Sequence, residues 1–280
     1  MLGIALALAA SVSWGISDFI GGLQTRRFSA LSVLLVSQPA GLVLAFGFAL
    51  AIGADRLSTG DFLLAAGGGV ALVLALGIFY RAMALGSISV VTTIGTLGIV
   101  VPVAFGLARG EEPTGLQTVG AVIALPAVMA VAHDPDPDWR TASRQSVGLA
   151  AVAALGFGIF LTILDAAAES DPAWTVAAMK VGSVAVLGIV ALYARPRLPA
   201  ARGRVLTALL AIGIFDVLAN TLYAVATTHG ILPLIAVAGS LYAVVTVLLA
   251  RFVLGERLAT TQRLGFVFAL VGVGLIAAGA

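Results

Sequence analysis

The chain has 280 residues, of which 61% are hydrophobic and 10% are charged, whereas a soluble domain carries about 25% charged residues. With 33 glycines in addition, too little polar surface remains to cover a water-soluble fold, so lipid must solvate most of the chain. The lack of cysteine excludes disulfides and thiolate metal sites, and a net charge of +2 does not indicate a nucleic-acid partner.

Apolar segments long enough to cross a membrane recur along the whole chain. A bilayer core of about 30 Å requires about 20 apolar residues in a helix. We therefore predict an all-α integral membrane fold, because a helix satisfies all of its backbone hydrogen bonds within the segment that crosses the lipid. The ten predicted transmembrane helices span residues 2–22, 29–53, 62–80, 87–108, 115–132, 147–168, 172–194, 205–228, 231–250 and 261–279.

The longest connection, HDPDPDWRTASRQS, contains two Asp-Pro pairs and alternating charges. Such a segment favours turns and extended structure over helix. It divides the chain into two predicted units of five helices, residues 1–132 and 147–280, joined by a cytoplasmic linker at 133–146.

The basic residues predict the orientation. Twelve of the fifteen Lys and Arg residues lie in odd-numbered connections and two in even-numbered ones, which places the odd connections in the cytoplasm and both termini outside. Arg26 and Arg27 follow the first apolar segment, whereas a cleaved signal has its basic residues first, so we expect this segment to remain as a helix of a multi-pass plasma-membrane protein.

The two halves share sequence patterns. The pattern G-E-x5-Q-x2-G begins at Gly110 and again at Gly255, an offset of 145 residues, and Leu8–Gly15 is related to Leu149–Gly156 at an offset of 141. Because each unit has five helices, an odd number, the second would insert upside down. Inverted repeats of this kind are typical of carriers.

Three stretches carry a resemblance to a known family. They are GSLYAVVTVLLARFVLGERLATT at Gly239–Thr261, its weaker counterpart at Thr96–Thr114, and SWGISDFIGG at Ser13–Gly22. Together they resemble the EamA family of the drug/metabolite transporter superfamily, over both halves. The resemblance implies ten helices in two inverted repeats, a central cavity, and export or exchange of small metabolites, amino acids or drugs. This chain has Ala243 where the family often has proline, which leaves a helix break there open.

Lys180 and Asp216 are the ionisable residues deepest in the predicted helices. They lie about 12 Å and about 17 Å from opposite faces at helical rise, so adjacent antiparallel helices could bring them together. Each costs at least about 2.5 kcal/mol in lipid and needs a partner or a function. They form either a structural ion pair or part of a cavity, with Asp216 titrating protons or binding an amine and Lys180 as its counter-charge or as an anchor for a substrate carboxylate.

Polar side chains on the same helix faces extend this candidate site. Asn220 and Tyr223 follow Asp216 at i+4 and i+7, and Trp14 and Asp18 share a face of the first helix. Asp18 either couples protons or pairs with the arginines that follow it. Trp14 either stacks on substrate or packs between helices, where its indole N–H needs an acceptor.

Hydroxyl groups on other predicted helices are further candidates. We predict substrate contacts for Tyr80, Thr93, Thr96 and Ser240, although hydroxyls in membrane helices usually bond to a carbonyl of their own helix. Gln38 precedes a proline in the middle of the second predicted helix. Because proline frees a carbonyl one turn back, we predict a polar kink there.

The sequence thus predicts a secondary transporter that moves a small amino-acid-like or amphiphilic molecule by alternating access. Its expected partners are the lipid bilayer, the small-molecule substrate and protons or an exchanged substrate, with no cofactor, metal or nucleic acid, and the chain would act as a monomer or homodimer. No set of side chains predicts catalysis. The alternatives are a membrane scaffold, a channel or an intramembrane enzyme.

Overall fold

The computed structural model describes the whole chain except residues 87, 133–143, 197, 199–201, 255–259 and 280. The described residues are helical or lie in short connections, and none of them forms a strand. The helices are α1 (Leu2–Thr25), α2 (Ala30–Ala51), α3 (Thr59–Leu85), α4 (Ile88–Thr96), the 3-10 helix η1 (Leu97–Ile99), α5 (Val100–Ala108), α6 (Gly115–Ala132), α7 (Arg144–Ala168), α8 (Pro172–Ala194), α9 (Arg204–Thr227), α10 (Leu232–Gly239), α11 (Tyr242–Leu254) and α12 (Thr260–Ala278).

The lengths and surfaces of these helices fit a bilayer. Within the described residues, eight helical segments are long and apolar enough to cross a membrane, and α6 and α12 contain shorter apolar segments. Large apolar side chains such as Val43, Leu63 and Phe252 are exposed on the outside of the bundle, where lipid rather than water would cover them. The prediction of an all-α integral membrane protein is confirmed.

Local sequence explains where several helices begin. The Ser29, Ser58 and Asp171 side chains each accept a hydrogen bond from the backbone N–H three residues later, which satisfies a free N–H of the first turn. Thr114 and Gln117 form a reciprocal capping box at the start of α6, with the Thr114 N–H donating to Gln117 Oε1 over 2.8 Å.

Two segments that the sequence predicts as single helices are interrupted. Of the predicted helix 87–108, residues 88–108 comprise α4, η1 and α5, and residues 231–250 comprise α10 and most of α11. The chain therefore changes helical geometry inside the bundle at two places, next to Thr96 and Ser240.

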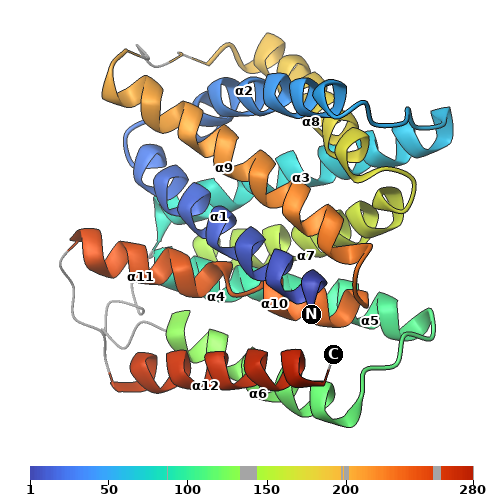
Figure 1. Ribbon diagram of the computed structural model, residues 1–280. Coiled ribbons are helices and arrows are strands. Elements are labelled where there is room, and N and C mark those ends of the chain that lie inside the picture. The colour runs from blue at the N-terminus through green and yellow to red at the C-terminus, as the bar shows by residue number, and fades with distance from the viewer. Residues whose placement is uncertain (87, 133–143, 197, 199–201, 255–259, 280) are drawn as a thin grey trace.

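Helices of the two halves interleave (Figure 1). The α2–α8 pair lies on one side of the bundle and the α6–α12 pair on the other, with α1, α3, α7 and α9 between them. The main contacts are reciprocal, because α3 packs on α7 and α8 just as α9 packs on α1 and α2. The bundle interior is thus formed jointly by the chain before and after the linker.

Glycines permit the closest of these crossings. A Cβ atom on Gly69 of α3 would lie 1.8 Å from the Met179 carbonyl oxygen of α8, and one on Gly213 of α9 would lie 2.2 Å from the Ser37 carbonyl oxygen of α2. Only glycine allows the backbones to approach this closely. The crossing of α3 with α8 fixes the depth at which Lys180 lies.

The linker predicted at 133–146 falls mostly outside the described residues, and its last three residues belong to α7. The first of the two G-E motifs is described, and Glu111 Oε2 accepts a hydrogen bond from the Leu232 N–H over 2.7 Å. Glu111 therefore caps the start of α10, which lies in the other half of the chain. The N-terminus of a helix favours a negatively charged group such as this carboxylate. The second motif begins in residues outside the described part.

Candidate functional site

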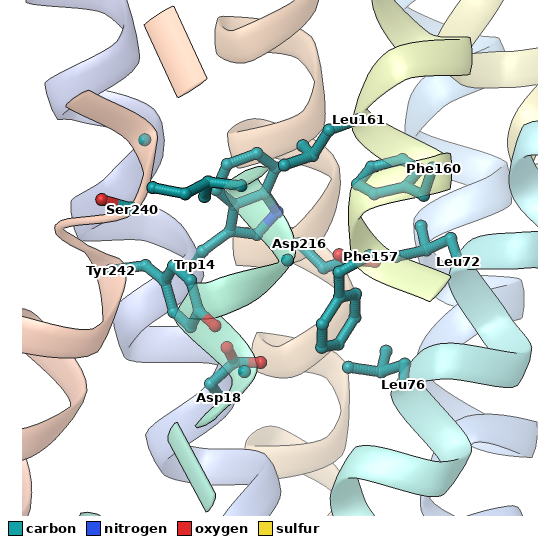
Figure 2. A pocket seen from close by; sticks show the side chains of 14 residues that line it. Trp14, Asp18, Leu72, Leu76, Phe157, Phe160, Leu161, Asp216, Ser240 and Tyr242 are labelled. Carbon is teal, nitrogen blue, oxygen red and sulfur yellow. The ribbon is translucent and has the colours of Figure 1, made fainter. Parts of the chain in front are cut away.

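A cavity lies where α1, α3, α7 and α9 meet the two interrupted helical segments (Figure 2). The centre of a water molecule can move through about 50 Å³ of it, which is room for a few waters at about 10–15 Å³ each. The described residues that line it are Trp14, Asp18, Leu72, Leu76, Gly95, Gly98, Ile99, Phe157, Phe160, Leu161, Asp216, Gly239, Ser240 and Tyr242.

The helix interruptions contribute backbone and small residues to this cavity. Thr96 and Ser240, 144 residues apart in the chain, lie at the two interruptions. The Thr96 hydroxyl donates to the Thr93 carbonyl over 2.6 Å, and the Ser240 hydroxyl donates to the Val237 carbonyl over 2.7 Å. Ser240 lines the cavity, whereas Thr93 and Thr96 do not. The hydroxyls of Thr96 and Ser240 thus form hydrogen bonds within their own helical segments, as is usual in membrane helices.

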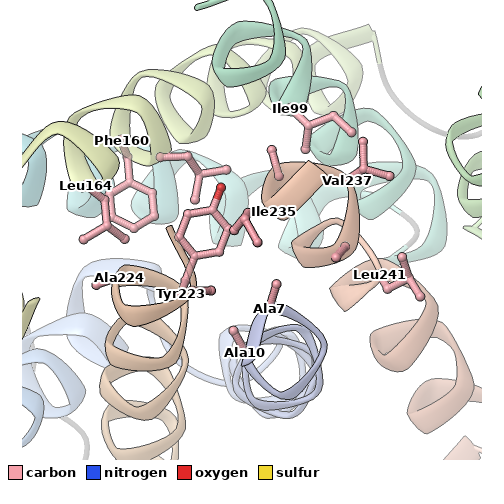
Figure 3. Close-up of a cluster of buried hydrophobic side chains, with 14 of the residues drawn as sticks. Ala7, Ala10, Ile99, Phe160, Leu164, Tyr223, Ala224, Ile235, Val237 and Leu241 are labelled. Carbon is pink, nitrogen blue, oxygen red and sulfur yellow. The ribbon is translucent and has the colours of Figure 1, made fainter. Parts of the chain in front are cut away.

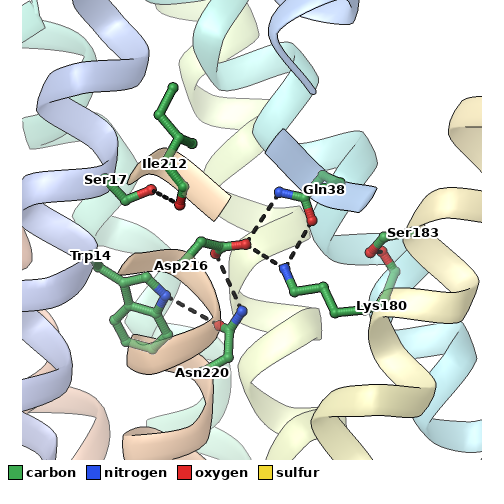
Figure 4. Close-up of polar contacts among 9 residues, drawn as sticks. Trp14, Ser17, Gln38, Lys180, Ser183, Ile212, Asp216 and Asn220 are labelled. Atoms are coloured by element: carbon green, nitrogen blue, oxygen red, sulfur yellow. Dashed lines mark hydrogen bonds and ion pairs between the residues drawn. The ribbon is translucent and has the colours of Figure 1, made fainter. Parts of the chain in front are cut away.

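A buried polar cluster, shown in Figure 4, forms one side of the cavity. Lys180 of α8 forms an ion pair with Asp216 of α9 and donates to Gln38 Oε1 over 2.8 Å. Gln38 Nε2 donates to Asp216 Oδ2 over 3.1 Å, and Asn220 Nδ2 donates to Asp216 Oδ1 over 3.2 Å. Trp14 Nε1 donates to Asn220 Oδ1 over 3.2 Å. This polar cluster joins four helices.

Asp216 and Lys180 play unequal parts in this cluster. Asp216 lines the cavity and accepts hydrogen bonds through both carboxylate oxygens, whereas Lys180 is 0% exposed and is not among the lining residues. The structure therefore brings the two together and places the ammonium group behind the carboxylate. A buried charge needs such a partner, because desolvation without one costs several kcal/mol.

Asp18 is the second carboxylate in the lining. It is 8% exposed, and within the described part of the chain its carboxylate makes no hydrogen bond or ion pair. Arg26 and Arg27, the partners considered from sequence, are exposed at the end of α1 and do not pair with it. The cavity therefore presents a carboxylate that the described protein leaves unneutralised.

Aromatic side chains lie in the lining of the cavity and behind it. The Trp14 and Tyr223 rings lie 5.2 Å apart, and Tyr223 is completely buried in the hydrophobic cluster with Phe160, Leu164 and Ile235 (Figure 3). Tyr80 is also completely buried, with its hydroxyl packed against Gly21 and no part in the lining. Tyr223 thus supports Trp14 from behind.

Sequence reasoning missed several residues of this site. The sequence predicts only a kink at Gln38, yet its side chain forms hydrogen bonds to both members of the ion pair. Phe157, Phe160 and Tyr242 line the cavity but stand among other apolar residues in the sequence, where no polar spacing distinguishes them. The only available signal for Gln38 was a buried amide in an otherwise apolar helix, which requires hydrogen-bond partners.

A second ionic group connects the halves at the helix ends near the N-terminus. Arg109, just after α5, lies 2.9 Å from Glu169 and 3.4 Å from Asp165 of α7. The hydrogen bond to Glu169 is the main cause that raises the pKa of the Arg109 guanidinium. The Arg109 side chain is 41% exposed, so solvent screens these pairs and they add little stability.

The fold and the cavity are those of a multi-pass helical membrane protein. The model of the EamA-like transporter family matches residues 1–132 and again residues 145–278. The chain belongs to this family, a part of the drug/metabolite transporter superfamily, and the family indicates a membrane transporter.

Solved structures share the fold. One, titled only as the crystal structure of a protein, aligns over 99% of this chain and 97% of its own with a TM-score of 0.76 and 15% identity. None of the curated proteins matches this chain. At such low identity the structural likeness shows the fold alone.

Proposed function

We propose that this protein is a secondary transporter of a small amphiphilic metabolite, with the cavity as its substrate site and alternating access as its mechanism. The observation that carries the proposal is that two carboxylates and several aromatic rings line one cavity between both halves of the chain. A lipid-facing or purely structural interior would have no reason to keep Asp18 there without a partner. The proposed substrate contacts are Trp14, Asp18, Asp216 and Ser240, with Lys180, Asn220 and Tyr223 behind them; Tyr80, Thr93 and Thr96 are not included.

The proposed architecture is two inverted repeats, residues 1–132 and 147–280, each with five membrane spans. The reciprocal packing of α3 on α7 and α8 and of α9 on α1 and α2 supports it. So do the close approaches of Gly69 to Met179 and of Gly213 to Ser37, which correspond at offsets of 144 and 142 residues. Repeats related in this way give two equivalent states, each open to one side. We also propose that both termini lie outside the plasma membrane.

Energy coupling in the proposal runs through the carboxylates of the cavity, by proton movement or by exchange of substrates. Asp216 is accessible from the cavity and hydrogen-bonded to three side chains from three helices. A change in its protonation would alter the contacts among α2, α8 and α9. Such a coupled charge is what a carrier needs to link a proton to a conformational change.

The experiment is proton flux in proteoliposomes that contain a pH-sensitive dye. Phenylalanine, 2-phenylethylamine, 3-phenylpropionate and adenosine are added in turn, and we expect at least one to drive a saturable flux that Asp216→Asn abolishes. Asp55→Asn, which removes an exposed carboxylate outside the bundle, is the control and should behave as the unmodified protein.

Because Asp216→Asn leaves Lys180 without its counter-charge, the double variant Lys180→Met/Asp216→Asn is measured beside it. The double variant restores charge balance and should still lose proton coupling. A flux that rises linearly with concentration would indicate a channel, and full coupling in the folded double variant would contradict the role of Asp216.

A further inference from the structure

We propose that the cavity binds a compact monovalent organic cation with an apolar body, held by Asp18, and that the cation and a proton occupy this carboxylate alternately. The proposal rests on the proposed function, because it takes the cavity to be the substrate site. It adds the substrate class and names Asp18 as the carboxylate that the cation and the proton share, within the coupling through both carboxylates proposed above.

The charges that line the cavity are the first reason to expect a cation. Its charged lining residues are Asp18 and Asp216, among those that the structure describes. Lys180 neutralises Asp216, and Gln38 and Asn220 donate to it as well. Asp18 has no such partner, so its ionisation leaves the site with one negative charge, which a single positive charge would balance.

The groups around Asp18 do not supply that positive charge. Asp216 on α9, Tyr80 on α3 and Tyr242 on α11, all on elements packed against α1, interact electrostatically with Asp18. Arg81, next to Tyr80 on α3, is exposed and forms no ion pair with Asp18. The described residues of α2 and α10 contain no ionisable side chain. Arg251, near the end of α11, does not line the cavity and makes contacts of its own.

Aromatic rings around the carboxylate indicate the rest of the ligand. Figure 2 shows Asp18 beside the rings of Tyr242 and Phe157 and below that of Trp14, all facing one hollow. Rings in this arrangement stabilise a cation through their electron-rich faces. The Tyr242 hydroxyl is buried and lacks a hydrogen-bond partner within the described residues, so the hollow also offers a polar atom to a ligand.

The size of the hollow and the cost of a buried charge complete the argument. The cavity has about 50 Å³ for the centre of a water molecule, so a compact cation fits better than a large dye. A buried carboxylate without a counter-charge is strongly unfavourable, because burial removes its hydration. Asp18 is therefore neutral with a proton or paired with the cation, and binding of an ammonium ion releases that proton into solution.

Binding to purified protein in detergent tests this inference without any need for transport. The probe is protonated 2-phenylethylamine, with the neutral 3-phenyl-1-propanol and the anionic 3-phenylpropionate as analogues of similar size. We expect the cation to bind at least 10-fold more tightly than either analogue. Its affinity should rise with pH, and calorimetry in buffers of different ionisation enthalpy should detect release of about one proton per cation bound.

Two variants isolate Asp18. Asp18→Asn should weaken binding of the cation at least 10-fold, abolish proton release and leave binding of the neutral alcohol unchanged, whereas Asp18→Glu should restore cation preference in part. Binding of the alcohol shows that each variant is folded, and Asp55→Asn serves as the matched charge control. Equal binding of the cation and the alcohol, or full proton release by Asp18→Asn, would overturn the proposal.

The same set of ligands separates this inference from the proposed function. If phenylalanine or 3-phenylpropionate drives saturable flux while the cation does not bind, the protein is a transporter and only the substrate class assigned here is wrong. If the cation binds at Asp18 but no compound in the set shows saturable flux, the site assignment stands and the transporter proposal fails.

Discussion

Replacement of Lys180 by methionine is expected to lower the free energy of unfolding by about 3–5 kcal/mol. Methionine fills most of the volume of the lysine stem, but Asp216 would remain buried without its counter-charge. Its hydrogen bonds from Gln38 and Asn220 offset only part of that loss. The measurement is reversible unfolding in mixed detergent micelles.

A double-mutant cycle separates the ion pair from simple loss of packing. Addition of Asp216→Asn to Lys180→Met should recover part of the stability, with a coupling energy of about 1–3 kcal/mol. Arg109→Met is the control, because Arg109 forms a partly exposed pair that contributes about 0–1 kcal/mol. Additive effects of the two changes in the cluster would show that Lys180 and Asp216 do not depend on each other.

The substitution Gly69→Ala is expected to destabilise the fold by about 3 kcal/mol, at the upper end of the usual range for overpacking. The added Cβ would lie 1.8 Å from the Met179 carbonyl oxygen, so α3 and α8 must move apart. The movement would displace Lys180, one residue after Met179, from Asp216. Thermal unfolding in detergent measures the stability, and binding of 2-phenylethylamine reports the state of the cavity.

Gly67→Ala is a matched control on the same helix. Gly67 is exposed, and a Cβ there would meet no atom within 4 Å, so this change should alter stability by less than about 1 kcal/mol. Equal effects of the two substitutions would show that the close crossing of α3 and α8 does not hold the bundle together.

The sequence was sufficient to predict the helical membrane fold, because the length of an apolar run and the need to satisfy its backbone in lipid allow few alternatives. It left a break near Ala243 open, where the structure has the interruption next to Ser240, and it did not predict the interruption next to Thr96. A helix break inside a bundle depends on contacts with other helices, and an apolar run that contains a break has the same composition as one that is continuous.

The sequence also predicts part of the candidate site. Lys180, Asp216, Asn220 and Trp14 are polar or amphipathic residues in lipid-spanning segments, and such residues need partners. The structure joins all four in one polar cluster. Spacing along one helix could not show that Gln38 completes the cluster from another helix.

The aromatic part of the cavity was beyond the reach of sequence reasoning. Phe157 and Tyr242 resemble any other apolar residues of their helices, and only the crossing of α7 with the interrupted segments brings them to Asp18. The unpaired state of Asp18 likewise follows from the three-dimensional arrangement, since two arginines lie close to it in the sequence.

Two-sided labelling of a single cysteine tests the central claim, alternating access to the cavity, most directly. The natural chain has no cysteine, so Ser240→Cys places one thiol in the lining, with Leu74→Cys on the exposed face of α3 as the unreactive control in lipid. A charged, membrane-impermeant methanethiosulfonate reagent should modify Ser240→Cys from either side of the membrane. Addition of 2-phenylethylamine should change the two rates in opposite directions. Modification from one side only, under every condition of pH and ligand, would contradict the account.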